Sequence, residues 1–157
     1  MFIEDKDSDN YTTDKQGWEI IKPYIPKNKK IWSPFYCDGK QKEYFKEMGY
    51  DIIHENKDFF NYTPNCDIII DNPPFSKVKL ICERLKTLDK PFILLSFSKT
   101  LLYKWFQRLF KDDLQIIIPF KRPTYTHLTH PKKGYTPPFG AMYYCYKMKL
   151  KKDLIFI

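Results

Sequence analysis

The chain has no apolar run long enough to cross a bilayer, which takes about 18 residues or more. Its amino terminus is acidic and polar, and this is not the pattern of a secretory signal. A membrane partner is therefore not expected. We expect an intracellular protein in a reducing compartment, either the cytoplasm or the nucleus.

The chain also lacks a pair of closely spaced cysteines. Its cysteines are far apart in the sequence: Cys37, Cys66, Cys82 and Cys145. Without a CxxC pair a zinc site is not expected, and a buried free thiol is the usual state of such residues. His127 and His130 have the spacing of a metal pair but no evident third ligand. We therefore predict surface-loop histidines and no metal site.

Arginine is scarce, although the chain is basic. Only Arg84, Arg108 and Arg122 are arginines among 27 basic residues, and 19 acidic residues leave a formal net charge of +8. A positive excess favours a polyanionic partner such as nucleic acid, and it carries no information about the fold. A lysine-rich composition also follows from an A/T-rich coding sequence, so the charge supports this partner without identifying it.

Length and composition indicate one globular domain. With 157 residues, of which 18% are aromatic, the chain can bury a core of its own, whereas two domains are not expected. Residues 1–10 are acidic and poor in apolar side chains. We predict a flexible acidic tail over 1–10 and a single domain over 11–157.

Strand and helix patterns alternate along this domain. Helical spacing of apolar residues predicts helices over 12–25, with a kink or early end at Pro23, and over 40–48, 76–85 and 101–110. Short apolar runs predict strands over 30–35, 50–55, 66–70, 91–97, 115–120 and 141–148. The alternation predicts an α/β fold with a mostly parallel twisted sheet and helices on both faces. The last two strands have no helix between them, so we expect an antiparallel pair at one edge.

The most informative segment follows the strand pattern Ile68–Ile70. This run ends at Asn72-Pro73-Pro74-Phe75, and Ser76 is a suitable N-cap for the next helix. Two consecutive prolines remove backbone donors and stiffen the turn. In an open α/β sheet, ligands bind at the carboxyl ends of the strands. A rigid polar turn followed by an aromatic ring is therefore expected at a ligand-binding edge.

This turn resembles the Asn-Pro-Pro-Phe/Tyr motif of the S-adenosylmethionine-dependent N6-adenine methyltransferases. The resemblance implies that Asn72, Pro73, Pro74 and Phe75 are catalytic. The exocyclic nitrogen of adenine is a poor nucleophile, so the Asn72 oxygen and the Pro73 carbonyl would accept its hydrogens and orient it. Phe75 would hold the base by stacking. The alternative is a plain strand-to-helix turn that contains two prolines.

The segment after the first predicted strand matches part of the family's cofactor loop. These enzymes usually carry Asp/Glu-Pro-Phe-x-Gly-x-Gly, and this chain retains the Pro34-Phe35 step and the last glycine, Gly39. It departs at Ser33, where an acid is expected, and at Cys37, where a glycine is expected. Asp38 is the acid that could replace the missing one. An ordinary strand-to-helix turn is again the alternative.

Two acidic segments complete the cofactor site that the resemblance implies. Glu55 ends the next strand, where an acid can accept hydrogen bonds from ribose hydroxyls. Asp58 and Phe59 belong to an Asp-Phe-Phe segment that resembles the one contacting the cofactor's adenine in these enzymes. Solvated surface acids are the alternative. The resemblance thus assigns S-adenosylmethionine to Thr12, Pro34, Phe35, Asp38, Gly39, Glu55, Asp58, Phe59 and Asn72.

The order of these segments covers residues 11–76 and corresponds to the family's unpermuted arrangement, with the cofactor half before the catalytic half. The combination looks like a compact subgroup found in protists and large DNA viruses, so a viral protein acting in a host cell is included in the expectation. The subgroup implies a class I, Rossmann-like methyltransferase fold.

The loop between the last two predicted strands interleaves basic and aromatic residues, a pattern that suits nucleic acid. The substrate-binding residues are expected to be Phe75, Lys121, Arg122, Tyr125, Lys132 and Lys133. A target base inside a duplex would have to be flipped to reach Phe75. A solvated edge hairpin is the alternative. No separate target-recognition domain is evident, which leaves open low sequence specificity, a structured RNA, or a partner subunit or homodimer.

Two further functions stay open. The same Asn-Pro-Pro-Tyr/Phe loop serves enzymes that methylate glutamine amides in proteins, since an amide nitrogen poses the same electronic problem. The departures at Ser33 and Cys37 also allow a catalytically inactive subunit that scaffolds or binds nucleic acid.

Overall fold

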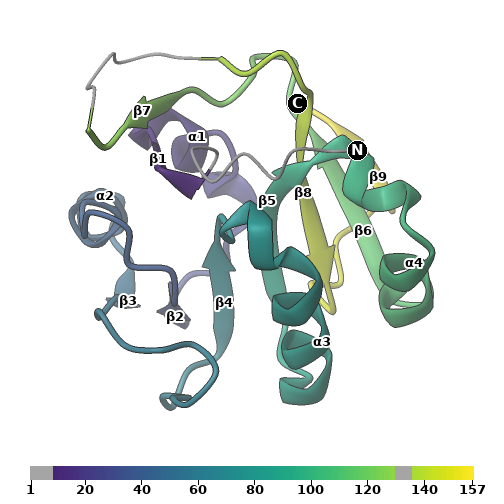
Figure 1. The fold of residues 1–157 in the computed structure, drawn as a ribbon, viewed down its shortest axis with the longest axis horizontal. Helices are drawn as coiled ribbons and strands as arrows, with labels where there is room; N and C mark the ends of the chain where they lie inside the picture. The colour runs from purple at the N-terminus through teal and green to yellow at the C-terminus, as the bar shows by residue number, and fades with distance from the viewer. Residues whose placement is uncertain (1–8, 130–135) are drawn as a thin grey trace.

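Short apolar runs form the strands of one sheet in the computed structural model, which describes residues 9–129 and 136–157 (Figure 1). The strands of this sheet are β2 (Lys30–Trp32), β3 (Asp51–Ile53), β4 (Ile68–Asp71), β5 (Phe92–Phe97), β6 (Leu114–Ile118), β8 (Ala141–Tyr146) and β9 (Leu154–Phe156). Their order across the sheet is β3-β2-β4-β5-β8-β6-β9. All six predicted strands are present, and β9 is an addition that the sequence analysis missed.

The sheet is mostly parallel, as predicted. Strands β3, β2, β4 and β5 run in one direction, and β9 is parallel to β6. The predicted antiparallel pair is present as β6 and β8, but its predicted place at the edge is wrong. Strand β8 also pairs with β5, and β9 forms the edge instead. The side chains Tyr143–Tyr146 of β8 are all buried, which suits a strand covered on both faces, whereas Leu154 and Phe156 of β9 are exposed.

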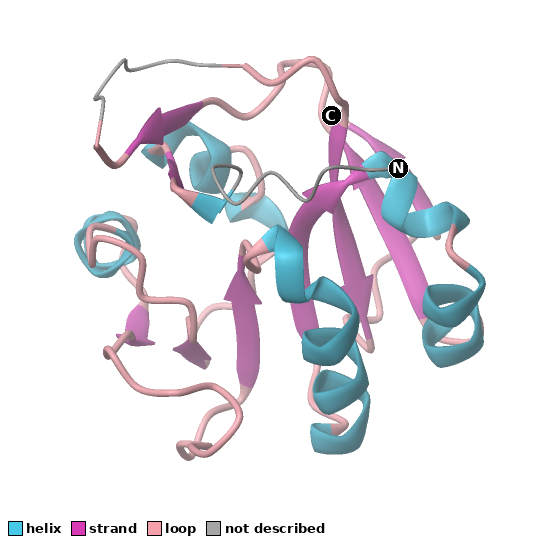
Figure 2. Ribbon diagram, viewed as in Figure 1, coloured by secondary structure: helices cyan, strands magenta, loops and turns pink. Residues whose placement is uncertain are grey.

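Helices cover both faces of the sheet, which confirms the prediction (Figure 2). They are α1 (Lys15–Glu19), α2 (Gln41–Glu47), α3 (Val78–Leu88) and α4 (Lys104–Phe110), with 3₁₀ turns η2 (Lys22–Tyr24), η3 (Phe75–Lys77) and η4 (Ser98–Leu102). Alternate residues of β5 point to opposite faces. Ile93 and Leu95 join the core under α1 and α2, whereas Phe92 and Leu94 join the core under α3 and α4.

A second, small sheet replaces the start of the first predicted helix. Strand β1 (Tyr11–Thr13) pairs antiparallel with β7 (Tyr125–His127), and the helix that follows is short and stops before η2, where Pro23 lies. The Asp14 side chain does not cap α1, because its carboxylate accepts hydrogen bonds of 2.6 Å from the hydroxyls of Thr124 and Thr126. The pairing of β1 with β7 places both strands above the carboxyl ends of the central strands of the large sheet (Figure 1).

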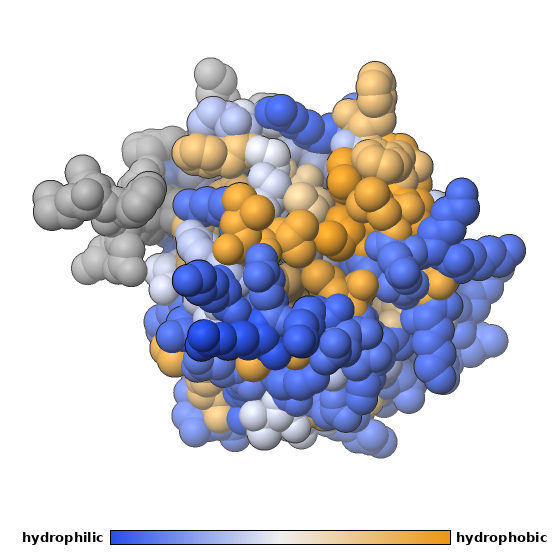
Figure 3. All heavy atoms as spheres, turned by 90° about the vertical axis from the view of Figure 1, so that its right-hand side faces the viewer, coloured by the Kyte–Doolittle hydropathy of each residue, from blue (hydrophilic) through white to orange (hydrophobic). Residues whose placement is uncertain are grey.

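Apolar side chains gather on the face at the β9 side of the sheet (Figure 3). Exposed apolar residues on the elements of this side include Leu102 on η4 and Leu154 and Phe156 on β9. Hydrophilic side chains dominate the lower part of the same view. None of the helices in the described ranges is both long enough and apolar enough to span a membrane.

Candidate active site

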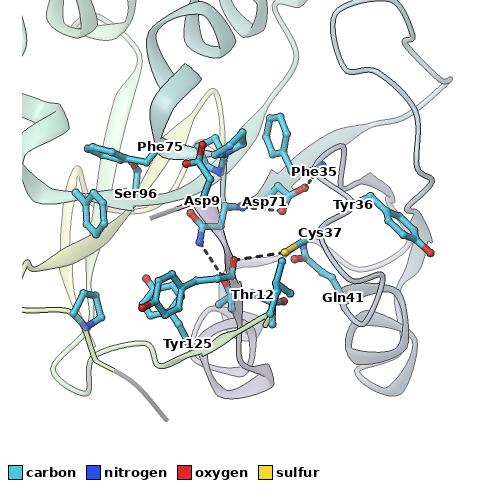
Figure 4. A pocket seen from close by; sticks show the side chains of 18 of the residues that line it. Asp9, Thr12, Phe35, Tyr36, Cys37, Gln41, Asp71, Phe75, Ser96 and Tyr125 are labelled. Atoms are coloured by element: carbon cyan, nitrogen blue, oxygen red, sulfur yellow. Dashed lines mark hydrogen bonds between the residues drawn. The ribbon is translucent and has the colours of Figure 1, made fainter. Parts of the chain in front are cut away.

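A cavity of about 480 Å³ opens at the carboxyl ends of β4 and β5, between the large sheet and the β1–β7 pair (Figure 4). It brings together three segments that are far apart in the sequence: the turn after β2, the Asn-Pro-Pro-Phe turn after β4, and β1. The predicted site residues that line it are Thr12, Phe35, Asn72, Pro73, Pro74, Phe75 and Tyr125. Its volume is in the range of ligand pockets, about 300–1,000 Å³.

The Asn72 side chain lies in this cavity in a fixed orientation. Its Nδ2 donates a hydrogen bond of 3.1 Å to the Thr13 hydroxyl on β1. A side-chain amide has one donor group and one acceptor oxygen, so this bond leaves the oxygen to accept from a ligand. Thr13 is 4% exposed and also lines the cavity. The sequence analysis missed Thr13, because it placed this segment in a helix rather than a strand.

Asp71 connects the two predicted ligand loops and was not predicted. Its Oδ2 accepts hydrogen bonds from the Phe35 backbone N–H at 2.7 Å and from the Ser33 hydroxyl at 2.8 Å. Its Oδ1 accepts from the Asn72 backbone N–H at 2.8 Å. Burial raises the pKa of the Asp71 carboxyl to about 6, against smaller opposing effects of the His54 charge and these hydrogen bonds. One carboxylate thereby holds the start of both loops.

Three buried polar side chains, those of Ser33, Gln41 and His54, form a hydrogen-bond network next to Asp71. Gln41 on α2 donates to the Ser33 hydroxyl at 2.8 Å and to the Ile70 carbonyl at 3.3 Å. The Nδ1–H of His54 donates to the Ser33 carbonyl at 2.8 Å, and the Nε2 of His54 has no hydrogen-bond partner among the residues that the structure describes. Ser33 is itself fully buried, so it orients Asp71 instead of facing the cavity. We call Thr13, Asp71 and Asn72 the floor of the cavity.

The predicted cofactor loop reaches the cavity through only part of its length. Phe35, Tyr36 and Cys37 line the cavity, whereas Pro34 and Gly39 do not. Gly39 has a φ of +78°, the left-handed region that favours glycine at this turn.

Asp38 does not take the place of the missing acid in the cavity lining. Its carboxylate accepts from the Thr12 hydroxyl at 3.3 Å and pairs with Lys40 at 3.3 Å. The carboxylate that reaches the cavity from behind this loop is that of Asp71.

The other predicted cofactor residues lie outside the cavity lining. Glu55 accepts from the Tyr62 hydroxyl at 3.1 Å, and its hydrogen bond with Lys57 lowers the pKa of the Glu55 carboxyl. Asp58 accepts from the backbone N–H of Phe60 at 3.0 Å and so stabilises its own turn.

Phe59 belongs to the core and is 5% exposed. Its ring centroid lies 5.2 Å from that of Phe35, which it supports from behind.

Aromatic rings form one wall of the cavity. The Phe75 and Phe97 rings meet edge to face with centroids 4.5 Å apart, and the Phe139 ring lies 5.8 Å beyond Phe97. Lys99 extends its ammonium over the Phe75 ring, 4.5 Å from the centroid. We call Phe75, Phe97, Phe139 and Lys99 the mouth of the cavity. Of these residues only Phe75 was predicted, because the others come from distant segments.

Asp9 also lines the cavity, so the predicted flexible tail does not extend through residue 9. Its carboxylate accepts hydrogen bonds from the Ser76 hydroxyl and, at 3.2 Å, from the Ser76 backbone N–H. Ser76 is thus engaged with Asp9 and does not act as the predicted helix N-cap. Residues 1–8 lie outside the described part of the chain.

Of the residues predicted to bind substrate in the segment after β6, Tyr125 lines the cavity. Tyr125 is 7% exposed and lines the cavity, and burial raises the pKa of its hydroxyl. Lys121 and Arg122 are exposed and lie outside the cavity lining. The predicted contacts of Lys132 and Lys133 lie outside the described residues, as does His130.

His127 is not the surface histidine that was predicted. It is 7% exposed, and its ring meets the Tyr11 ring edge to face with centroids 4.7 Å apart. Within residues 9–129 and 136–157, no group of three or more His, Cys, Asp or Glu side chains is arranged to hold a metal. The four cysteines are free thiols, buried except for Cys37.

Neither a scan against protein-family models nor a search of the curated proteins finds a match to this chain.

Proposed function

We propose that this chain is an S-adenosylmethionine-dependent methyltransferase that acts on an exocyclic amino group, the N6 of adenine in DNA or RNA. One observation carries the proposal: the Asn-Pro-Pro-Phe turn and the Pro-Phe loop open into the same cavity, and Asp71 joins them through its two oxygens. The antiparallel strand β8 inserted into an otherwise parallel sheet is also consistent with a class I methyltransferase fold.

The lining chemistry fits the methionine end of S-adenosylmethionine. The buried carboxylate of Asp71 suits a cation, the hydroxyls of Thr12 and Thr13 suit a carboxylate or amine, and the rings of Phe35 and Tyr36 offer apolar contact. These residues would hold the cofactor, which when bound supplies an electrophilic methyl group. Glu55 and Asp58 would meet its adenosine end only if that end extends beyond the described cavity.

The floor supplies the orientation that a weak amine nucleophile needs. The Asn72 oxygen is an acceptor for a hydrogen of the target amino group, because its Nδ2 is already bonded to Thr13. The stiff Pro73-Pro74 step keeps this acceptor in place, and the carbonyl of Pro73, which lines the cavity, would be the second acceptor. Acceptors that are already oriented require little reorganisation during reaction. Phe75 would stack on the base at the mouth.

Nucleic acid is the proposed partner because a net charge of +8 attracts a polyanion and the mouth offers ring faces to a flat base. The deciding experiment is methyl transfer from labelled S-adenosylmethionine to separate DNA, RNA and protein pools. We expect label in DNA or RNA as N6-methyladenine. Label in protein glutamine would instead support the glutamine N-methyltransferase. Titration calorimetry with S-adenosylmethionine completes the test, since absence of binding would indicate an inactive scaffold.

A further inference from the structure

Within the described part of the chain, the ammonium of Lys99 is contacted by aromatic rings and by no other side chain. Its Nζ lies 4.5 Å from the Phe75 ring centroid, 5.7 Å from that of Phe139 and 5.9 Å from that of Phe97. Among the described residues it has no carboxylate partner within 4.0 Å. A cation–π contact is a weak partner for an ammonium compared with a charge-assisted hydrogen bond to an anion.

Lys99 does not itself line the cavity, but its ammonium lies over the ring of Phe75, which does. A base that stacks on Phe75 needs a ring face, and Lys99 covers one in the free protein. Lys99 is half-buried, and an ammonium that leaves a ring face gains a stronger partner in an anion. The carboxylate of Asp9, which lines the cavity, is already bonded to Ser76.

We propose that Lys99 binds the phosphate of the target nucleotide, and that the three rings hold its ammonium in place until that phosphate arrives. The proposal rests on the function proposed above and specifies its substrate class. The phosphate of a nucleotide is one sugar away from its base, so a base on Phe75 brings an anion to the neighbouring Lys99. A glutamine amide carries no such anion. The mouth is therefore suited to a nucleotide and not to a protein side chain.

The experiment compares 2′-deoxyadenosine 5′-monophosphate with 2′-deoxyadenosine, which lacks the phosphate. Calorimetry measures both affinities for the full chain saturated with S-adenosylhomocysteine, in wild type, Lys99→Met and Lys99→Arg. We expect Lys99→Met to bind the monophosphate about tenfold more weakly, as loss of a charged hydrogen bond predicts. Its affinity for the nucleoside should stay within about twofold of wild type. Lys99→Arg should recover most of the loss, because its guanidinium also binds phosphate.

Lys104→Met is the matched control. Lys104 is exposed on the adjacent helix α4 and contacts none of the three rings. Its loss should leave both affinities unchanged, and thermal melting of each variant confirms an intact fold.

Three outcomes overturn the inference. An equal loss for nucleoside and monophosphate in Lys99→Met would mean that Lys99 acts only by packing the rings. Unchanged affinity for both ligands would mean that it has no part in binding. In either case the proposed function survives if the wild type still methylates adenine. If the wild type binds neither ligand and labels no nucleic acid, the proposed function fails as well.

Discussion

The floor and the mouth of the cavity are built from different chemistry. The floor residues Asp71 and Thr13 are buried. Asp71 accepts hydrogen bonds from Ser33 and Phe35, and Thr13 accepts one from Asn72, which leaves the Asn72 side-chain oxygen for a ligand. The mouth is half-open: Phe139 is 57% exposed, and the contacts of the Lys99 ammonium with described side chains are to ring faces. A bonded, buried floor can orient a reacting amine, whereas a mouth of ring contacts can rearrange to admit a base. Substitutions in the floor should therefore affect turnover, whereas substitutions in the mouth should affect substrate binding.

Asn72→Ala tests the floor and has the largest expected effect. Turnover should fall by at least about 100-fold, the size of loss seen when one preorganised polar group is removed from an active site. S-adenosylmethionine affinity should stay close to that of the wild type. Single-turnover methylation and calorimetry measure the two quantities. Turnover at the parental rate would show that Asn72 does not orient the substrate.

Because of Asp71, the free energy of unfolding should depend on pH. Its pKa is raised from 3.8 to about 6 in the folded protein, so the folded state binds this proton more readily than the unfolded state. The stability it contributes is therefore fully present below about pH 4 and is lost as the pH rises through about 6. Asp71→Asn should lack this pH-dependent difference in the free energy of unfolding.

Activity should change with pH in the opposite direction. The ionised carboxylate accepts from the Phe35 and Asn72 N–H groups, so turnover should fall as Asp71 becomes protonated below about pH 6. Denaturant unfolding and turnover, each measured from about pH 4 to about pH 7, test both signs. Asp112→Asn, at an exposed position, is the control. If Asp71→Asn and Asp112→Asn give the same pH profiles, Asp71 does not titrate as inferred.

Phe75→Ala tests the mouth. Loss of base stacking should weaken oligonucleotide binding by about 1–3 kcal/mol and leave S-adenosylmethionine affinity nearly unchanged. Fluorescence anisotropy with a labelled single-stranded oligonucleotide and calorimetry with the cofactor provide the two values. Equal losses in both would indicate misfolding and would remove the distinction between mouth and floor.

The smallest effect on nucleic-acid binding is expected from substitutions outside the cavity, at Lys121 and Arg122. Both are exposed and do not line the cavity, so their proposed role is contact with phosphates flanking the target. Replacing either by alanine should weaken oligonucleotide binding a few-fold and reduce the salt slope by about 1. Anisotropy titrations over a range of salt concentrations measure this slope. An unchanged slope would restrict the nucleic-acid surface to the mouth.

Local patterns were enough to predict most of the sheet. The runs that became β4 and β5 are apolar over consecutive residues, as buried parallel strands require, and the helix pattern after Ser76 became α3. The Pro73-Pro74 step also marked the end of β4 and a turn that lines the cavity, because proline lacks the backbone donor that a strand needs. These features depend on residues that are neighbours in the sequence.

Long-range partners could not be predicted in this way. Thr13 bonds to Asn72 across 59 positions, and Asp71 joins the turn after β2 to the turn after β4. Strand β8 pairs between β5 and β6 although it follows both in the chain. Each of these outcomes depends on which surfaces meet after the helices pack.

Amino-acid order alone established the α/β class, the basic charge and a rigid Asn-Pro-Pro-Phe turn at a strand end, because periodicity, charge and proline act locally. Packing decided which side chains share the cavity. It buried Ser33, turned Asp38 away, brought in Asp71 and placed Lys99 on Phe75. The reason is physical: burial and hydrogen-bond partnership are properties of neighbours in space, and a chain acquires these neighbours only when it folds.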